Sequence, residues 1–242
     1  MKKISQLLTF LISFSCLAND SIFNSANNDY SNQNYKQAIE KYELIVTNNL
    51  ESSELYYNLA NSYFKTNKNH LAIYYYEKAL KIDPNFLDAI ENLEICNSQI
   101  TDKIEKIPEL FFISIFNDFQ KILSLKNWIV LTVILIWLAI LIFVFNLFRE
   151  KKNNFPLLLT IISFCFFLLC VSINNKDKTN KFAIIFSPKV EVMSAPSKQS
   201  TELFNLHIGT KVKISDSINN WINIVLENGK KGWILKENIK EI

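Results

Sequence analysis

Apolar and small residues recur at helical spacing over residues 53–86 and form two stripes. The first stripe has positions i, i+3, i+4 and i+7 and consists of Tyr56, Leu59, Ala60 and Tyr63. The second stripe consists of Ala72, Tyr76 and Ala79. Side chains at these spacings share one face of a helix, and the segment ends at Pro84, which stops a helix. The pattern predicts two helices packed through their stripes, with the small residues Ala60 and Ala72 allowing a close approach.

The same pattern recurs at an interval of 34 residues, because Ala38 and Tyr42 precede Ala72 and Tyr76 by this distance. The partner helix, near residues 22–30, keeps Ala26 at the small position. Residues 87–100 continue the phase as the first helix of a third unit, which we expect to cap the stack. The motif aromatic–x2–Leu–small–x2–Tyr, followed by Ala, aromatic, Ala and Pro, resembles the tetratricopeptide repeat. The resemblance implies helical hairpins over residues 19–106 that bind proteins or peptides.

In tetratricopeptide proteins the first helix of each unit lines a concave groove. The resemblance places the following residues on that groove: Asn27, Glu54, Tyr57, Asn58, Asn61 and Lys65. Asn27 and Asn58 occupy places used by members that clamp a peptide carboxylate. Phe23 stands where that clamp has a Lys, which argues against a free C-terminal carboxylate as ligand. The alternative for each of these side chains is an ordinary solvated helix face.

Two long apolar runs predict a transmembrane hairpin over residues 127–174. Trp128–Phe148 and Phe155–Ile173 are long enough to span a bilayer, and only six residues separate them. The hairpin therefore predicts that both flanking domains lie on one side of the membrane. The alternative is a buried helical hairpin in a soluble protein.

The first 18 residues have the pattern of a secretory signal. Two lysines precede the apolar core Leu7–Leu17, and small residues at Cys16 and Ala18 fit cleavage before Asn19. A lipoprotein signal using Cys16 and an uncleaved anchor are the alternatives. An exported N-terminus, together with the basic turn between the two runs, predicts an inner-membrane protein with both soluble domains in the periplasm.

The connector 107–126 has its own amphipathic pattern. Its apolar stripe consists of Ile115, Phe116, Phe119, Ile122 and Leu123. Polar residues oppose this stripe, which fits a helix lying in the membrane interface before the first span. A helix packed under the repeats fits the pattern equally well.

Residues 182–242 change to short β-runs separated by Gly-bearing turns, which predicts a small all-β barrel. The motifs G-T-K-V at Gly209 and N-G-K-K-G-W-I at Asn228 resemble the bacterial SH3 domain. The segment M-S-A-P departs from that family, which usually has Arg and Gly there, so the ligand of this loop does not follow from the resemblance. Trp221 and Trp233 are candidates for a shallow ligand groove; the alternative is that both lie in the core.

Composition indicates a protein without catalytic chemistry. The net charge is +3, and no basic cluster interleaved with aromatics points to nucleic acid. No Cys or His lies at metal-ligand spacing from His70, in the expected inter-helix turn, or from His207, in a strand or turn of the barrel. No glycine precedes Gly209, so a phosphate-binding loop of the usual kind is absent from the sequence. We therefore expect no catalytic residues, no metal and no cofactor. The cysteines predict no disulfide outside the membrane.

The order of signal, repeats, transmembrane hairpin and SH3 domain resembles that of the BatE-type proteins of the Bat aerotolerance operon. The resemblance implies a non-enzymatic inner-membrane scaffold, with von Willebrand-type membrane proteins as partners and a MoxR-type ATPase nearby. The rival hypothesis is an envelope anchor or sensor whose SH3 domain binds peptidoglycan. A third hypothesis, an accessory to an enzyme, requires a catalytic chain supplied in trans.

Overall fold

The computed structural model describes residues 21–105, 107–108, 110–148, 154–179 and 181–242. The expected signal segment and most of the turn between the apolar runs lie outside these residues. The described chain forms two compact units. One combines the residues up to Glu105 with Phe182–Ile242, and the other is Lys106–Lys181. The predicted multidomain architecture of helical hairpins, two long apolar helices and an all-β domain is confirmed.

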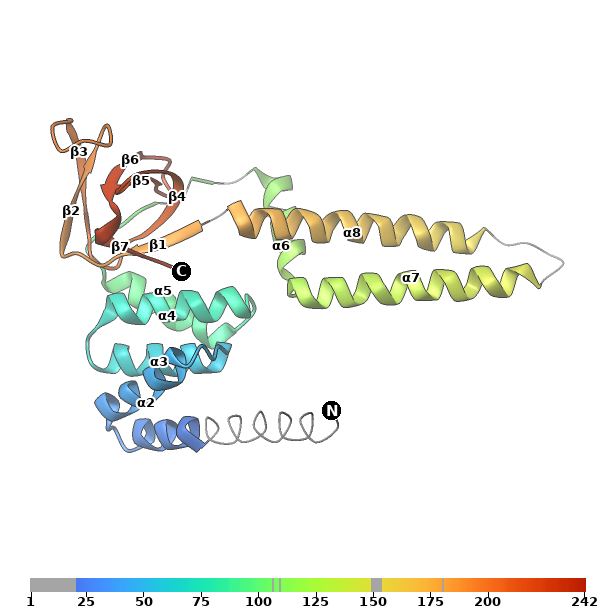
Figure 1. Ribbon diagram of the computed structural model, residues 1–242, viewed down its shortest axis with the longest axis horizontal. Helices are drawn as coiled ribbons and strands as arrows, with labels where there is room; N and C mark the ends of the chain where they lie inside the picture. Colours follow the sequence, from blue (N-terminus) through green and yellow to red (C-terminus); the bar gives the residue numbers. More distant parts are fainter. Residues whose placement is uncertain (1–20, 106, 109, 149–153, 180) are drawn as a thin grey trace, which may run out of the picture. The chain divides into compact units, whose positions relative to one another are not determined.

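The first unit begins with stacked helices (Figure 1). Residues 21–31 are helical, and they are followed by α2 (Tyr35–Thr47), α3 (Ser53–Lys65), α4 (Asn69–Ile82) and α5 (Leu87–Gln99). The side chain of Ser52 caps α3 by accepting a hydrogen bond from the amide of Leu55. Gln33, Asn49 and Asn67 follow three of these helices with positive φ, a conformation that Asn tolerates better than most residues and that turns the chain back.

The predicted stripes form the core of the helical stack. Tyr56, Leu59, Ala60 and Tyr63 on α3 and Ala72, Tyr76 and Ala79 on α4 are all buried. Ala60 and Ala72 are 0% exposed. Ala26 and Ala38 are buried as well, in agreement with the 34-residue phase. His70 was expected in the turn between the helices, but it lies in the first turn of α4. The turn is shorter than expected because Lys68 already serves as the N-cap of that helix.

The C-terminal part of the first unit is an antiparallel sheet that closes around its own core. Its strands are β1 (Lys181–Ile185), β2 (Lys189–Met193), β3 (Glu202–His207), β4 (Lys211–Ile218), β5 (Trp221–Val225), β6 (Lys231–Leu235) and β7 (Ile239–Glu241). Their order in the sheet is β3-β2-β6-β5-β4-β1-β7. The core includes Val192, Val212, Ile222, Ile224 and Ile234. Alternation along each strand buries these residues and turns their neighbours outward.

One of the predicted Gly-bearing turns lies at Gly209, between two short strands. Gly209 has a φ of +91° and separates β3 from β4. A side chain at this φ is strained, so the turn suits Gly. The amide of Gly209 donates to the carbonyl of Ile185 at 2.8 Å, and Ile185 donates to Thr210 at 3.0 Å. These bonds fix the turn against the end of β1.

The helical stack and the barrel share apolar contacts, which sequence patterns did not predict. Ile184 of β1 is 0% exposed and belongs to the core of the helical stack. Phe186 and the C-terminal Ile242 pack against the same core. The ring of Phe186 meets the rings of His70 and Tyr74 edge to face, with centroids 5.4 and 5.7 Å apart. The barrel therefore covers one end of the repeats.

The second unit contains α6 (Phe111–Lys121), α7 (Leu125–Leu147) and α8 (Phe155–Thr179). Two helical segments, Leu125–Leu147 and Phe155–Asn175, are long and apolar enough to cross a membrane. The two helices pack along each other around Trp128, Leu169 and Cys170. Most of their other apolar side chains are exposed, which distinguishes them from the core helices of a soluble protein.

Candidate functional site

Hydrogen bonds between asparagine and tyrosine side chains join neighbouring helices of the repeats. The side-chain oxygen of Asn27 accepts from the hydroxyl of Tyr42 at 2.5 Å and from Nδ2 of Asn58 at 3.0 Å. We call these three residues the first triad. They lie on the 21–31 helix, α2 and α3, so the bonds join consecutive helices of the stack.

A second triad repeats this arrangement one unit later. The side-chain oxygen of Asn61 accepts from the hydroxyl of Tyr76 and, at 3.1 Å, from Nδ2 of Asn92. Each member lies 34 residues after its counterpart in the first triad. The sequence predicted Asn27, Asn58 and Asn61 as groove residues, but Asn92 was not among them. The 34-residue interval from Asn58 was the signal that could have found it.

Burial keeps both tyrosines of the triads as hydrogen-bond donors. Burial is the main cause that raises the pKa of Tyr42, and neighbouring Tyr30 adds to it. Burial likewise raises the pKa of Tyr76 far above its ordinary value, with a further contribution from Cys96. A protonated hydroxyl donates its proton to the asparagine oxygen. The oxygens of Asn27 and Asn61 are therefore fully engaged inside the stack.

The amide nitrogens of Asn27 and Asn61 have a different environment. Neither Nδ2 atom makes a hydrogen bond within the described chain, and neither is among the buried polar atoms without a partner. Both residues are half-buried. Each nitrogen therefore keeps access to solvent, and the two triads present two N–H donors one repeat apart.

Of the remaining predicted groove residues, Tyr57 contacts the second triad, whereas Glu54 and Lys65 make no hydrogen bond to either triad within the described chain. Tyr57 packs against Phe86 with ring centroids 4.8 Å apart, and its hydroxyl accepts from Asn92 at 3.3 Å. Glu54 and Lys65 are exposed near opposite ends of α3 and take no part in either triad. Phe23, where a carboxylate clamp has Lys, lies 5.9 Å from the ring of Tyr42.

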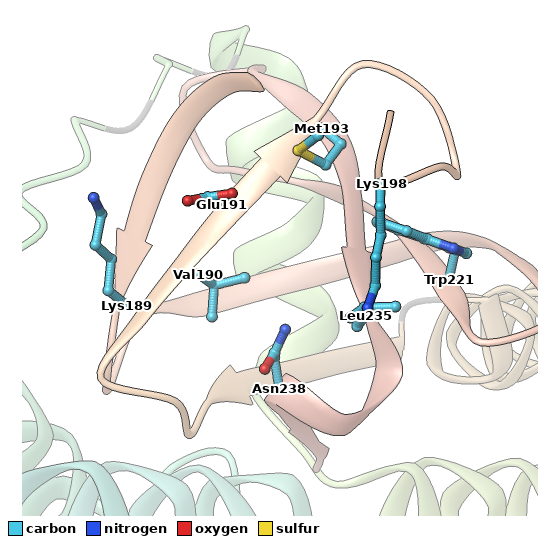
Figure 2. A pocket seen from close by; sticks show the side chains of 8 residues that line it. All are labelled: Lys189, Val190, Glu191, Met193, Lys198, Trp221, Leu235 and Asn238. Carbon is cyan, nitrogen blue, oxygen red and sulfur yellow. The ribbon is translucent and has the colours of Figure 1, made fainter. Parts of the chain in front are cut away.

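The barrel carries a separate pocket of about 440 Å³ (Figure 2). Its lining residues are Lys189, Val190, Glu191, Met193, Lys198, Trp221, Leu235 and Asn238. Trp221 is therefore at the pocket, whereas Trp233 is not among its lining residues. In the view of Figure 2, Trp221 and Lys198 are on one side of the pocket, and Lys189 and Glu191 are on the other. The pocket combines an aromatic ring with charges of both signs.

Both tryptophans lie on the outer face of the barrel, and the alternative that both belong to its core is wrong. Trp221 and Trp233 are half-buried, whereas Ile222 and Ile234 beside them are 2% and 0% exposed. Trp221 pairs with Leu235, and Trp233 pairs with Asn223. The two rings are thus diagonal neighbours on one face of the β5–β6 ladder.

Polar contacts also join the barrel to the repeats. The Asp102 carboxylate accepts from the amide of His207 at 2.6 Å, from its Nδ1 at 2.8 Å and from the hydroxyl of Thr210 at 2.6 Å. An ionised carboxylate only accepts, so Nδ1 carries the proton of this bond. Lys211 pairs with Glu77 at 2.6 Å. His207, expected in a strand or turn of the barrel, ends β3 and forms an interdomain contact.

Within the residues that the structure describes, no group of three or more His, Cys, Asp or Glu side chains could hold a metal ion. His70 faces the ring of Phe186. His207 faces Asp102. The arrangement of the described residues thus offers binding surfaces formed by amide, aromatic and charged side chains.

Comparisons with known proteins identify two domains. Residues 53–86 match the tetratricopeptide repeat model, and residues 190–240 match the bacterial SH3 domain model. A search of curated proteins gave no match. A solved structure of an NlpC/P60 family protein from Bacillus cereus ATCC 10987 is 18% identical with a TM-score of 0.23. That similarity covers 30% of this chain and 23% of the Bacillus cereus protein. This chain therefore spans about a quarter of the length of that protein.

Proposed function

We propose that this protein is a non-enzymatic membrane scaffold that binds an extended segment of a partner protein along the groove of its repeats. The observation that carries the proposal is the pair of triads, each with one free amide nitrogen. An extended peptide rises about 3.3 Å per residue and presents backbone carbonyls along its length. The Nδ2 groups of Asn27 and Asn61 can donate to two such carbonyls. Because their oxygens are held by tyrosine hydroxyls, the donors are oriented before a ligand binds.

Further groove residues would add selectivity to this backbone recognition. The ring of Tyr57 offers an apolar contact beside the second triad. Glu54 and Lys65 carry opposite charges near the two ends of α3. A partner segment with a basic residue toward Glu54 and an acidic residue toward Lys65 would fit this surface.

The contacts between the repeats and the barrel support the proposed membrane topology. Asp102 lies before the two apolar helices, and His207 lies after them. Their direct hydrogen bonds require both domains to be on the same side of a membrane. A hairpin of α7 and α8 satisfies this requirement, whereas a single span would not. The signal-like N-terminus and the basic turn favour the periplasmic side of the inner membrane.

The domain order supports a place in a Bat-type aerotolerance or envelope-stress complex. In that setting the partner is a von Willebrand-type membrane protein, and the repeats bind one of its extended segments. This assignment rests on the resemblance of the domain order.

The experiment replaces the two donors while keeping the acceptors. Asn27→Asp and Asn61→Asp preserve an oxygen for the tyrosine hydroxyls but exchange Nδ2 for a carboxylate oxygen. Two lost hydrogen bonds of about 0.5–1.5 kcal/mol each, plus repulsion of the peptide carbonyls, should weaken binding about tenfold or more. The readout is co-purification of the von Willebrand-type protein from membranes, with helicity checked by circular dichroism.

Asn97→Asp is the matched control, because Asn97 is exposed on α5 and its side chain belongs to neither triad. This variant should retain the partner. Full retention of the partner by folded Asn27→Asp/Asn61→Asp protein would contradict the groove proposal.

A second candidate function is binding of peptidoglycan by the barrel, favoured by the pocket at Trp221. Lys189 and Lys198 could meet carboxylates of a stem peptide, while Glu191 could meet an amine. Trp221→Ala should reduce sedimentation with purified peptidoglycan, and Trp233→Ala should leave it unchanged because Trp233 lies outside the pocket. Equal sedimentation of both variants and the unaltered protein would argue against this pocket.

A further inference from the structure

Helix α6 exposes one apolar side. Phe112, Ile115 and Phe116 are 68%, 54% and 49% exposed. The polar residues of the helix, such as Ser114 and Asn117, project from the opposite side at the 100° per residue of an α-helix. An amphipathic helix of this kind has to place its apolar side against some surface.

The C-terminal end of α6 is fixed to the beginning of the first long apolar helix. Nε1 of Trp128, on α7, donates to the carbonyl of Gln120 at 3.1 Å. The ring of Phe119 lies 5.3 Å from the ring of Trp128. Nε2 of Gln120 also reaches Ser172 on α8 at 3.4 Å. These contacts hold α6 where α7 begins and α8 approaches its end.

Within this unit α6 runs crosswise to α7 and α8 (Figure 1). A helix crosswise to two membrane spans lies parallel to the membrane plane. Its contacts with Trp128 and Ser172, each within one or two turns of an end of the apolar spans, set its depth near the membrane surface. Trp is enriched at this depth, because its ring is apolar and its N–H needs a polar partner. Here that partner is the carbonyl of Gln120.

We infer that α6 is an in-plane helix whose apolar side lies among the lipids at the bilayer surface. The inference rests on the proposed membrane embedding of α7 and α8. The occupant is lipid because α6 is held at the beginning of α7 and near the end of α8, two helices whose apolar side chains are also mostly exposed. The helix then orients the hairpin and fixes the depth at which the chain leaves the membrane toward the repeats.

The test is a spin-label scan of the full chain reconstituted in vesicles of phosphatidylethanolamine and phosphatidylglycerol. Native cysteines are replaced by Ser, and single cysteines are introduced along α6. Labels at Ile115 and Phe116 should be relaxed more by oxygen, which concentrates in lipid. Labels at Ser114 and Asn117 should be relaxed more by a water-soluble nickel chelate. The oxygen-to-nickel ratio should therefore oscillate with the helical period.

Two control positions separate this inference from the proposal it rests on. A label at Leu141, on α7, should have a high oxygen-to-nickel ratio, and a label at Leu87, exposed on α5, should have a low one. A low ratio at Leu141 would overturn the membrane embedding itself. A high ratio at Leu141 with nickel access around all of α6 would overturn the in-plane helix alone. Protection of Ile115 and Phe116 from both reagents would also overturn it, because the apolar side would then pack on protein.

Discussion

The carboxylate of Asp102 accepts hydrogen bonds from both the backbone amide and the ring of His207, which lies 105 residues away. The hydroxyl of Thr210 adds a third bond to the same side chain. Asp102 follows the last helix of the repeats, and His207 ends β3 of the barrel. One side chain thus ties together two domains that the apolar helices separate in sequence. The groove of the repeats and the pocket of the barrel consequently belong to one body.

Removing the charge of Asp102 should loosen this connection. Asn in place of Asp keeps one acceptor oxygen but turns an N–H₂ group toward donors. Hydrogen bonds to a charged group contribute about 1.5–3 kcal/mol, so Asp102→Asn should lower the free energy of unfolding by about that amount. Chemical denaturation of the full chain in detergent measures it. Glu94→Gln, which removes a charge from the exposed face of α5, should have little effect. Equal losses in the two variants would mean that the bonds to His207 contribute nothing.

The same contact should respond to acid. Burial raises the pKa of Asp102, but the hydrogen bonds from Thr210 and His207 outweigh it and lower the pKa below its ordinary value. A group with a lowered pKa in the folded state contributes stability above its unfolded pKa of about 3.9 and loses it as the pH falls through the folded value. The stability difference between the unaltered protein and Asp102→Asn should therefore shrink between pH 5 and pH 3. A difference that stays constant over this range would contradict the lowered pKa.

A close approach at Gly209 gives a second test of the interdomain contact. A Cβ at Gly209 would lie 2.9 Å from Cγ2 of Ile100, and the φ of +91° disfavours any side chain. Gly209→Ala should therefore cost about 1–3 kcal/mol of unfolding free energy. Ile100→Ala would remove the clash but not the backbone strain. The double variant should lose less than the sum of the single losses, with a coupling of at least about 0.5 kcal/mol. Additive losses would mean that Ile100 does not press on Gly209.

Periodic features of this fold could be predicted from sequence, whereas contacts between distant segments could not. The stripe from Tyr56 to Tyr63 follows the helical period. The length of the two apolar runs is enough to predict two long apolar helices. The 34-residue interval also leads from the first triad to the second, including Asn92, which was not predicted. Asp102 and His207 have no such signal, because each is a single polar residue in an irregular or short segment. Trp221 and Trp233 show the same limit, since alternation places both on one face but cannot say which one borders a pocket.

Membrane topology can be tested with single cysteines in a chain whose native cysteines are replaced by Ser. Lys68→Cys lies at the exposed turn before α4, and Lys230→Cys lies in the exposed turn before β6. A hairpin with an exported N-terminus puts both outside the cytoplasm. An impermeant maleimide should therefore label both positions in intact spheroplasts. If one of the two positions were labelled only after lysis, the hairpin would be contradicted. If both positions were labelled only after lysis, both domains would lie in the cytoplasm.

Overpacking the helical core should weaken the repeats and the barrel together. Ala72 is 0% exposed on α4, in the core that also contains Ile184 of the barrel. Leu at this position adds three carbon atoms where none fits, which should cost about 1–3 kcal/mol. Because neighbouring units stabilise each other, the loss should extend along the stack and across to β1. Ala195→Leu makes the same chemical change at an exposed site and serves as the control. Thermal unfolding of the full chain should show one lowered transition for Ala72→Leu and an almost unchanged one for Ala195→Leu. If Ala72→Leu split the transition, with the barrel melting at its original temperature, the repeats and the barrel would unfold independently and the shared core would not couple them.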